Sequence, residues 1–189
     1  HLGIAPTSRE VRSNITVSEP DGTTTKLNSP GEDMPEHVLA RLGELLTEAA
    51  EGAEWVVLAG SLPPGVAPSW YADLVAGLKA VSARVAVDTS GAALKGVTEG
   101  IVLPDLLKPN GHELASIVGG SGDEFEADPI RAAKAAAGLV KRGVASVLVT
   151  LGGRGAVLAT KEGQWLASPP PINVVSTVGA GDSSLFGYL

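Results

Sequence analysis

The amino-acid sequence predicts an α/β protein with a doubly wound, mainly parallel sheet. Two observations lead to this prediction. Short apolar runs, such as residues 55–59 and 85–87, end in glycine or aspartate, as buried parallel strands often do. Between such runs lie segments in which apolar side chains recur at helical spacing. Strands that alternate with helices of about 10–15 residues are typical of a parallel sheet.

The expected elements follow one another along the whole chain. Polarity alternates over residues 12–19, which predicts a strand, and a turn at residues 20–22 (PDG) leads into a Thr-rich return strand over residues 23–26. Helices are expected over residues 35–50, 68–81 and 129–142, and another begins at residue 182. Further strands are expected over residues 55–59, 85–87, 106–108 and 144–150, with a hairpin over residues 156–159 and 164–167.

Composition limits the classes of function. With 14 Lys and Arg against 21 Asp and Glu, the net charge is -7, which argues against a nucleic acid or an anionic membrane as the main partner. The chain has no cysteine, so disulfides, thiolate metal sites and a Cys nucleophile are excluded. No apolar run approaches the roughly 20 residues of a membrane span. We therefore expect a cytoplasmic protein whose 189 residues form one domain.

The sharpest motif is TVGAGD at residues 177–182, followed by a helical pattern. Gly179 and Gly181 let the backbone approach an anion, and amides at a helix N-terminus carry partial positive charge. Asp182 is placed to reach a substrate hydroxyl beside that anion, as phosphoryl transfer requires. The alternative is a glycine turn with Asp182 as the helix N-cap. A dinucleotide fingerprint is excluded because Ser184 occupies the place of the third glycine.

A second motif, KPNGHE at residues 108–113, comes directly after an expected strand, where ligands bind in open α/β sheets. Asn110 and Glu113 share one face of an opening helical turn. An amide and a carboxylate there could hold water-bound magnesium, and Lys108 could pair with a nucleotide phosphate. The alternative is that Glu113 only stabilises the start of the helix.

Three loops give weaker signals. Residues 150–155 (TLGGRG), 60–65 (GSLPPG) and 88–91 (DTSG) each follow an apolar strand, so ligand binding and ordinary turn chemistry both fit them. No Gly-Lys-Ser/Thr triplet occurs, so a Walker A motif is absent. Arg12 and Lys26 lie on the first two expected strands, and as isolated surface cations they would indicate little.

Taken together and in this order, these segments resemble the phosphofructokinase B family of ribokinase-like sugar kinases. The most specific part is residues 176–182 (STVGAGD), which is similar to the family's C-terminal motif, although family members often have Asp where this chain has Ser176. The Ser-Thr-Val form resembles the branch that acts on sugar phosphates. Residues 12–14, 25–31, 60–65 and 108–113 resemble that branch as well.

The resemblance implies a ribokinase-like sheet with helices on both faces and a small β lid at about residues 11–31. Such lids cover the sugar and often make the dimer contact, so a homodimer through the lid is expected. Residues 1–189 would be an incomplete kinase domain that lacks its N-terminal part and its C-terminal end. The implied activity is ATP-dependent phosphorylation of fructose 1-phosphate to fructose 1,6-bisphosphate. Phosphorylation of tagatose 6-phosphate, or a catalytically silent sensor of sugar phosphate or nucleotide, are the alternatives.

The resemblance also implies a role for each matching residue. Asp182 would be the general base, and the amides of Gly179, Ala180 and Gly181 would stabilise the transferring phosphoryl group. Asn110 and Glu113 would position Mg²⁺, largely through water. The ATP phosphates and ribose would be lined by Lys108, Asn110, Thr150, Gly152 and Gly155. The sugar phosphate would be held by Arg12, Lys26, Asn28 and Ser61, with Arg12 on the phosphate itself.

Overall fold

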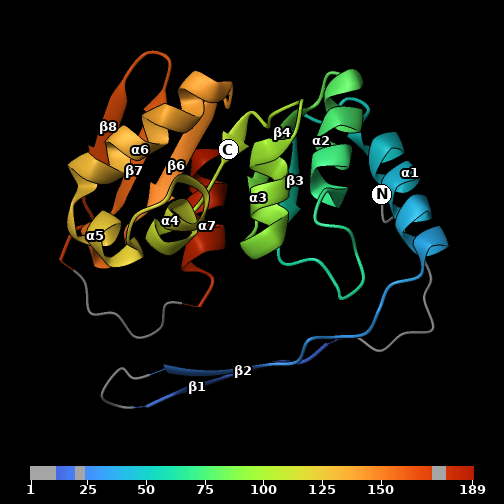
Figure 1. The fold of residues 1–189 in the computed structure, drawn as a ribbon, viewed down its shortest axis with the longest axis horizontal. Coiled ribbons are helices and arrows are strands. Elements are labelled where there is room, and N and C mark those ends of the chain that lie inside the picture. Colours follow the sequence, from blue (N-terminus) through green and yellow to red (C-terminus); the bar gives the residue numbers. More distant parts are fainter. Residues whose placement is uncertain (1–11, 20–23, 172–177) are drawn as a thin grey trace.

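The computed structural model describes residues 12–19, 24–171 and 178–189 (Figure 1). Its main body is a six-stranded sheet in which the strands follow chain order. These strands are β3 (Trp55–Ala59), β4 (Arg84–Asp88), β5 (Leu106–Leu107), β6 (Ser146–Thr150), β7 (Ala156–Thr160) and β8 (Gln164–Ala167). Neighbours from β3 to β6 pair in parallel, whereas β7 and β8 add as an antiparallel hairpin. The prediction of a mainly parallel α/β sheet is therefore confirmed.

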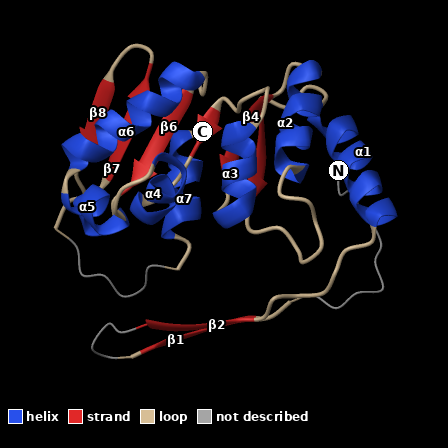
Figure 2. Cartoon of the chain, viewed as in Figure 1, coloured by secondary structure: helices blue, strands red, loops and turns tan. Residues whose placement is uncertain are grey.

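Helices cover both faces of this sheet (Figure 2). They are α1 (Glu36–Ala50), α2 (Trp70–Ala80), α3 (Gly91–Glu99), α4 (Gly111–Val118), α5 (Gly122–Ala127), α6 (Pro129–Arg142) and α7 (Ala180–Tyr188). Successive strand residues alternate between two apolar clusters. In β4, Val85 and Val87 pack with the helices α2 to α6, while Ala86 packs with Leu185 of α7 on the opposite face. This alternation follows from the two-residue period of a strand.

Local capping signals explain why α6 begins and ends where the sequence predicts. The side chain of Asp128 accepts hydrogen bonds from the backbone N–H groups of Ile130 and Arg131, and Pro129 opens the helix. Gly143 ends it in a left-handed conformation with φ of 119°. The start of β6 is thereby placed directly after the helix.

A separate two-stranded sheet consists of β1 (Asn14–Ser18) and β2 (Thr24–Asn28), which pair antiparallel with Asn14 opposite Asn28. It extends away from the main body, on the side toward which the carboxyl ends of the parallel strands point (Figure 1). The turn expected at residues 20–22 lies outside the described residues. Three apolar side chains of this sheet are exposed: Ile15, Val17 and Leu27.

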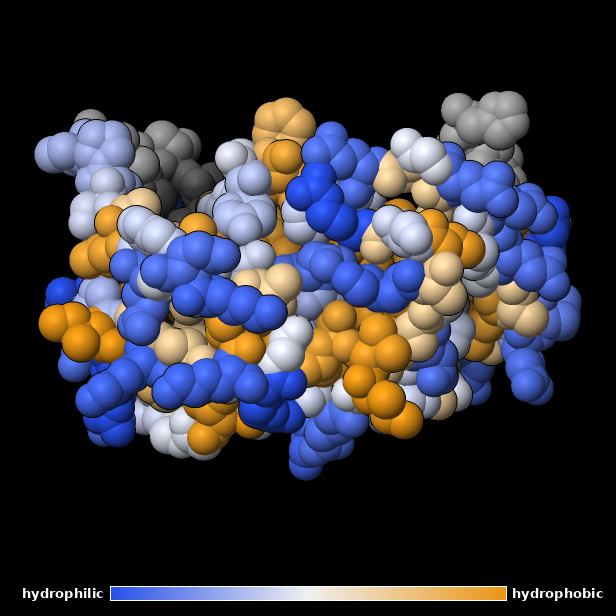
Figure 3. Space-filling model, turned by 90° about the horizontal axis from the view of Figure 1, so that it is seen from above, coloured by the Kyte–Doolittle hydropathy of each residue, from blue (hydrophilic) through white to orange (hydrophobic). Residues whose placement is uncertain are grey.

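The opposite end of the molecule carries mostly polar side chains, with apolar ones in several separate patches (Figure 3). Among the described residues, no helix combines the length and the apolar character that crossing a bilayer would require.

Candidate active site

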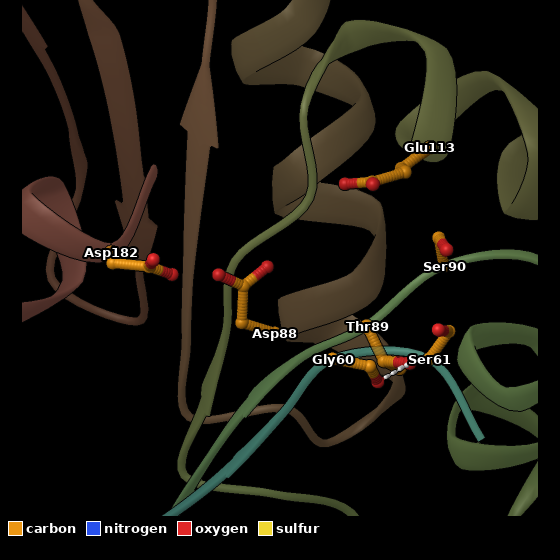
Figure 4. A pocket seen from close by; sticks show the side chains of 7 residues that line it. All are labelled: Gly60, Ser61, Asp88, Thr89, Ser90, Glu113 and Asp182. Carbon is orange, nitrogen blue, oxygen red and sulfur yellow. Dashed lines mark hydrogen bonds between the residues drawn. The ribbon is translucent and has the colours of Figure 1, made fainter. Parts of the chain in front are cut away.

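A cleft of about 240 Å³ opens at the carboxyl ends of β3 and β4. The two strands end in register, with Ala59 opposite Asp88, so their following loops leave the sheet side by side. The cleft is lined by Gly60, Ser61, Asp88, Thr89, Ser90, Glu113 and Asp182 (Figure 4). Three carboxylates thus meet there from three distant segments. Asp182 and Asp88 point toward one another, and Glu113 points into the same space (Figure 4).

One buried cation lies next to these acids. Lys108 directly follows β5, its side chain is only 5% exposed, and its Nζ lies 2.9 Å from Oδ2 of Asp88. The Asp88 side chain is 17% exposed. A buried ammonium group requires a counter-charge because desolvation of an isolated ion is very costly. Asp88 therefore balances Lys108 at the floor of the site.

The residues predicted to form an anion hole, Gly179, Ala180 and Gly181, stand at the start of α7. Gly179 occupies the cap position with φ of 76°, and no side chain forms a cap hydrogen bond. Asp182 is the third residue of the helix, so it is not the N-cap residue, and the alternative that it caps the helix is wrong. The first N–H groups of a helix have no partner within the helix, and they carry partial positive charge. Ser176 and Thr177 of the motif lie outside the described residues.

The glycine turn and Lys108 are close neighbours. A Cβ added to Gly181 would lie 3.2 Å from Nζ of Lys108, which leaves little room for any side chain at this position. The free amides of α7 and an ammonium group therefore converge on one region, beside the exposed carboxylate of Asp182. Such a region attracts an anion with several negative oxygens.

Asn110 and Glu113 form a reciprocal capping box at the start of α4. The Asn110 side chain accepts a hydrogen bond of 2.8 Å from the Glu113 N–H, and Oε2 of Glu113 accepts one of 2.8 Å from the Asn110 N–H. The alternative that Glu113 stabilises the helix start is thus realised, and its other oxygen faces the cleft. Burial raises the pKa of Glu113, the Asn110 N–H opposes this shift, and the charge of Asp88 adds to it.

The acidic side chains suit a cation held mainly through water. The described residues contain no group of three or more His, Cys, Asp or Glu that could hold a metal directly. Mg²⁺ commonly keeps several waters and uses one or two carboxylates together with substrate phosphates. Glu113 and Asp88 can supply acceptors for such waters, so the donor set fits the ion.

The glycine-rich loop after β6 lies beside this capping box. Thr150 and Asn110 form a parallel β-bridge, and the Thr150 N–H donates to the carbonyl of Pro109 at 3.0 Å. Two predicted ATP residues are therefore neighbours. Gly152, with φ of 54°, begins a short 3₁₀ turn, and no atom lies within 4 Å of the position that a Cβ would occupy. The loop is therefore open at that point.

Gly155 has a steric role that the sequence did not reveal. Its φ is 97°, and a Cβ there would collide with the carbonyl oxygen of Ala167 in β8. Only glycine allows the strands β7 and β8 to approach each other here.

The predicted sugar-phosphate residues are brought together in part. The Arg12 guanidinium donates to Oγ of Ser61 at 2.8 Å, although 49 positions separate the two residues. Asn28 is exposed on β2 and is not among the described residues that line the cleft. Lys26 lies opposite Thr16 in the same two-stranded sheet.

The sequence of the loop at residues 88–91 fits both a ligand-binding loop and an ordinary turn. The structure gives Asp88 and Thr89 specific partners, Lys108 and the Gly60 carbonyl. The sequence signal for these contacts was the run of polar residues at 88–91, directly at the carboxyl end of β4. Tyr71 in α2, whose hydroxyl also reaches the Gly60 carbonyl, gave no signal in the sequence, because a tyrosine on the apolar face of a helix looks like any other core residue.

Comparison with known proteins identifies this architecture. The family model for pfkB family carbohydrate kinases matches residues 8–188. The chain belongs to this family.

Curated relatives of the pfkB family give the similarity in more detail. The chain is 39% identical over 183 residues to 1-phosphofructokinase of Rhodobacter capsulatus, which covers 94% of this chain and 55% of that protein. It is 34% identical to 1-phosphofructokinase of Escherichia coli (strain K12), which covers 100% of this chain and 60% of that protein. The chain therefore spans little more than half the length of these relatives.

Solved structures confirm the ribokinase-like fold. Phosphofructokinase-2 from Escherichia coli in complex with fructose-6-phosphate superposes with a TM-score of 0.76 at 32% identity, covering 89% of this chain and 54% of that one. A possible 1-phosphofructokinase from Thermotoga maritima superposes with a TM-score of 0.77 at 26% identity, covering 94% and 55%.

Proposed function

We propose that the protein transfers the γ-phosphoryl group of ATP to the 6-hydroxyl of fructose 1-phosphate, giving ADP and fructose 1,6-bisphosphate. The observation that carries the proposal is the position of Asp182. This exposed carboxylate lines the cleft directly beside the amides of α7 and near the Lys108 ammonium group. A base next to an anion hole is the arrangement that phosphoryl transfer to an alcohol needs.

The chemistry follows from that placement. The sugar's 6-oxygen attacks the γ-phosphorus, its proton passes to Asp182, and the bond to the bridging oxygen of ADP breaks. The amides of Gly179, Ala180 and Gly181 stabilise the negative charge on the transferring group. Lys108, held by Asp88, adds a fixed positive charge at the same place.

The remaining residues divide between the two substrates. A β-bridge joins Asn110 to Thr150, and Gly152 and Gly155 belong to the loop that follows Thr150, which supports an ATP site on this side. When bound, Mg²⁺ would neutralise phosphate charge there, and Glu113 and Asn110 would hold it through water. On the other side, Arg12 and Ser61 form a polar pair suited to a phosphate group, and Lys26 and Asn28 are assigned to the sugar as well.

The two-stranded sheet offers a further proposal. Ile15 and Leu27 lie directly opposite each other and are both exposed, so one face of the sheet presents apolar side chains. We propose that it serves as the lid and contacts a second copy of the chain. Sedimentation velocity should show a dimer in the intact protein, and Ile15→Glu should shift it toward monomer. An unchanged distribution would contradict this contact.

A coupled ADP-release assay on the intact protein tests the activity. Fructose 1-phosphate is compared with tagatose 6-phosphate and fructose 6-phosphate, and the first should give the highest kcat/KM. A higher kcat/KM with tagatose 6-phosphate would make that sugar phosphate the substrate instead. Binding without turnover would favour the sensor.

Asp182→Asn tests the base. Asn at the third helical position keeps the shape of the side chain but cannot accept the hydroxyl proton. Single-turnover transfer should fall by about 10²–10⁴-fold, the usual contribution of a general base, while equilibrium binding of both substrates stays near normal. A rate within a few-fold of wild type would contradict the assignment. Ser183→Ala, on the same exposed turn, is the matched control.

A further inference from the structure

Two buried hydroxyl groups converge on one backbone carbonyl at the edge of the cleft. The Thr89 Oγ1 donates to the Gly60 carbonyl at 2.7 Å. The Tyr71 hydroxyl has one proton and shares it between the Ala59 carbonyl at 3.1 Å and the Gly60 carbonyl at 3.3 Å. Thr89 is 4% exposed and Tyr71 is 7% exposed. A carbonyl oxygen has two lone pairs, so the Gly60 oxygen can accept the main hydrogen bond from Thr89 and the weaker, shared one from Tyr71.

The carbonyl belongs to the first peptide of the loop that carries Ser61. The Gly60 N–H is fixed as well, because it donates to the carbonyl of Asp88 at 2.9 Å. Gly60 has φ of 92°, and no atom lies within 4 Å of the position where a Cβ would lie, so no steric contact at that position fixes its conformation. Glycine otherwise adopts this region and its mirror equally well. The hydrogen bonds from Thr89 and Tyr71 therefore act together with that of the Gly60 N–H to favour one orientation of the loop.

Peptide planarity transmits this orientation to Ser61. In a trans peptide the C=O of Gly60 and the N–H of Ser61 point in opposite directions. Because the carbonyl is held against two buried hydroxyls, the N–H must point away from them. Ser61 lines the cleft, and its Oγ accepts the hydrogen bond from Arg12. The N–H of Ser61 forms no hydrogen bond with another described residue.

We propose that Thr89 and Tyr71 are positioning residues that lock the Gly60–Ser61 peptide, so that the Ser61 N–H joins the Arg12 guanidinium in binding the phosphate group of the sugar. The inference rests on the proposed function for the identity of the ligand. The locking itself is a property of the free protein. Tyr71 does not line the cleft, and Thr89, which does, gives its hydroxyl to the Gly60 carbonyl, so both act through that carbonyl.

Thr89→Val in the intact protein removes the hydroxyl and keeps the shape of the side chain. KM for fructose 1-phosphate should rise about three- to tenfold, the range of one ordinary hydrogen bond, while KM for ATP stays within twofold. Tyr71→Phe should act in the same direction with a smaller effect, since its bond is longer. The double variant should exceed either single one. Thr89→Ser restores the hydroxyl and should restore KM.

Thr98→Val is the matched control. Thr98 is 5% exposed, and its hydroxyl donates to the Lys95 carbonyl within α3, away from the cleft. The Thr98→Val variant loses an equivalent buried hydrogen bond, and KM for fructose 1-phosphate and for ATP should both stay unchanged. Equal rises in both KM values for Thr89→Val, or the same change in Thr98→Val, would mean that Thr89 is merely structural and would overturn the proposal.

Amide exchange separates this inference from the proposed function. Mass spectrometry of peptides that span Gly60 should show exchange several-fold faster in Thr89→Val than in wild type or Thr98→Val, without any ligand. If wild type phosphorylates no sugar phosphate while Gly60 exchanges faster, the function fails and the locking stands. Unchanged exchange of Gly60 overturns the locking, whatever the activity.

Discussion

Replacing Lys108 by methionine should be among the most destabilising changes near the cleft. The substitution keeps most of the side-chain volume and leaves the largely buried carboxylate of Asp88 without its partner at 2.9 Å. At an effective dielectric constant of about 20, two unit charges at this separation attract by about 6 kcal/mol, much of which offsets the desolvation of both groups. Removing one partner of a buried pair typically costs about 3–5 kcal/mol, and we expect that loss here.

Urea unfolding of the intact protein at pH 7 measures the cost. Lys95→Met is the matched control, because Lys95 and Glu99 form a 3.9 Å pair with side chains 65% and 61% exposed. Such a surface pair should contribute less than about 0.5 kcal/mol. Adding Asp88→Asn to Lys108→Met should recover part of the loss. If Lys108→Met costs no more than the control, or if the two changes are additive, Asp88 is not the counter-charge of Lys108.

Three further predictions rest on single contacts. Glu113→Gln should leave the fold intact, because glutamine can accept the same hydrogen bond from the Asn110 N–H and so keeps the capping box. The magnesium concentration for half-maximal activity should rise several-fold, and an unchanged magnesium requirement would contradict the metal role. Gly155→Ala should lower the free energy of unfolding by about 2–4 kcal/mol, because the new Cβ is strained at positive φ and collides with the Ala167 carbonyl. Gly152→Ala, whose Cβ would lie in open space, should lower it by only about 1 kcal/mol, and equal losses in urea unfolding would refute the steric role of Gly155. Burial raises the pKa of Tyr71 above the ordinary 10.0, so the folded state keeps a proton that the unfolded chain releases. Stability should therefore fall as pH rises above 10.0, and pH-dependent urea unfolding should show a smaller fall in Tyr71→Phe.

Helices α3 and α5 show where local pattern fails. Helix α3 contains Gly91 and Gly96, and glycine is a poor helix former, so its sequence does not predict a helix. A Cβ on Gly96 would collide with the carbonyl of Pro68, before α2, so the glycine is needed for close packing between the two segments. Helix α5 has only six residues, fewer than a clear apolar period requires.

The sequence by itself determined the features that depend on neighbours within a turn or a strand. Apolar runs located β3, β4 and β6, and the Asp128, Pro129 and Gly143 signals bounded α6. The glycine turn before Asp182 and the spacing of Asn110 and Glu113 also indicated the chemistry, because each requires only residues close along the chain.

Only the tertiary structure decided which of these segments meet. The contact of Arg12 with Ser61, the pairing of Lys108 with Asp88, and the approach of Tyr71 to the Gly60 carbonyl all join elements far apart in sequence. An apolar strand packs equally well beside several others, so its sequence does not specify its neighbour. The packing of the whole sheet with its helices sets the order of the strands. That order places these polar groups within hydrogen-bonding distance.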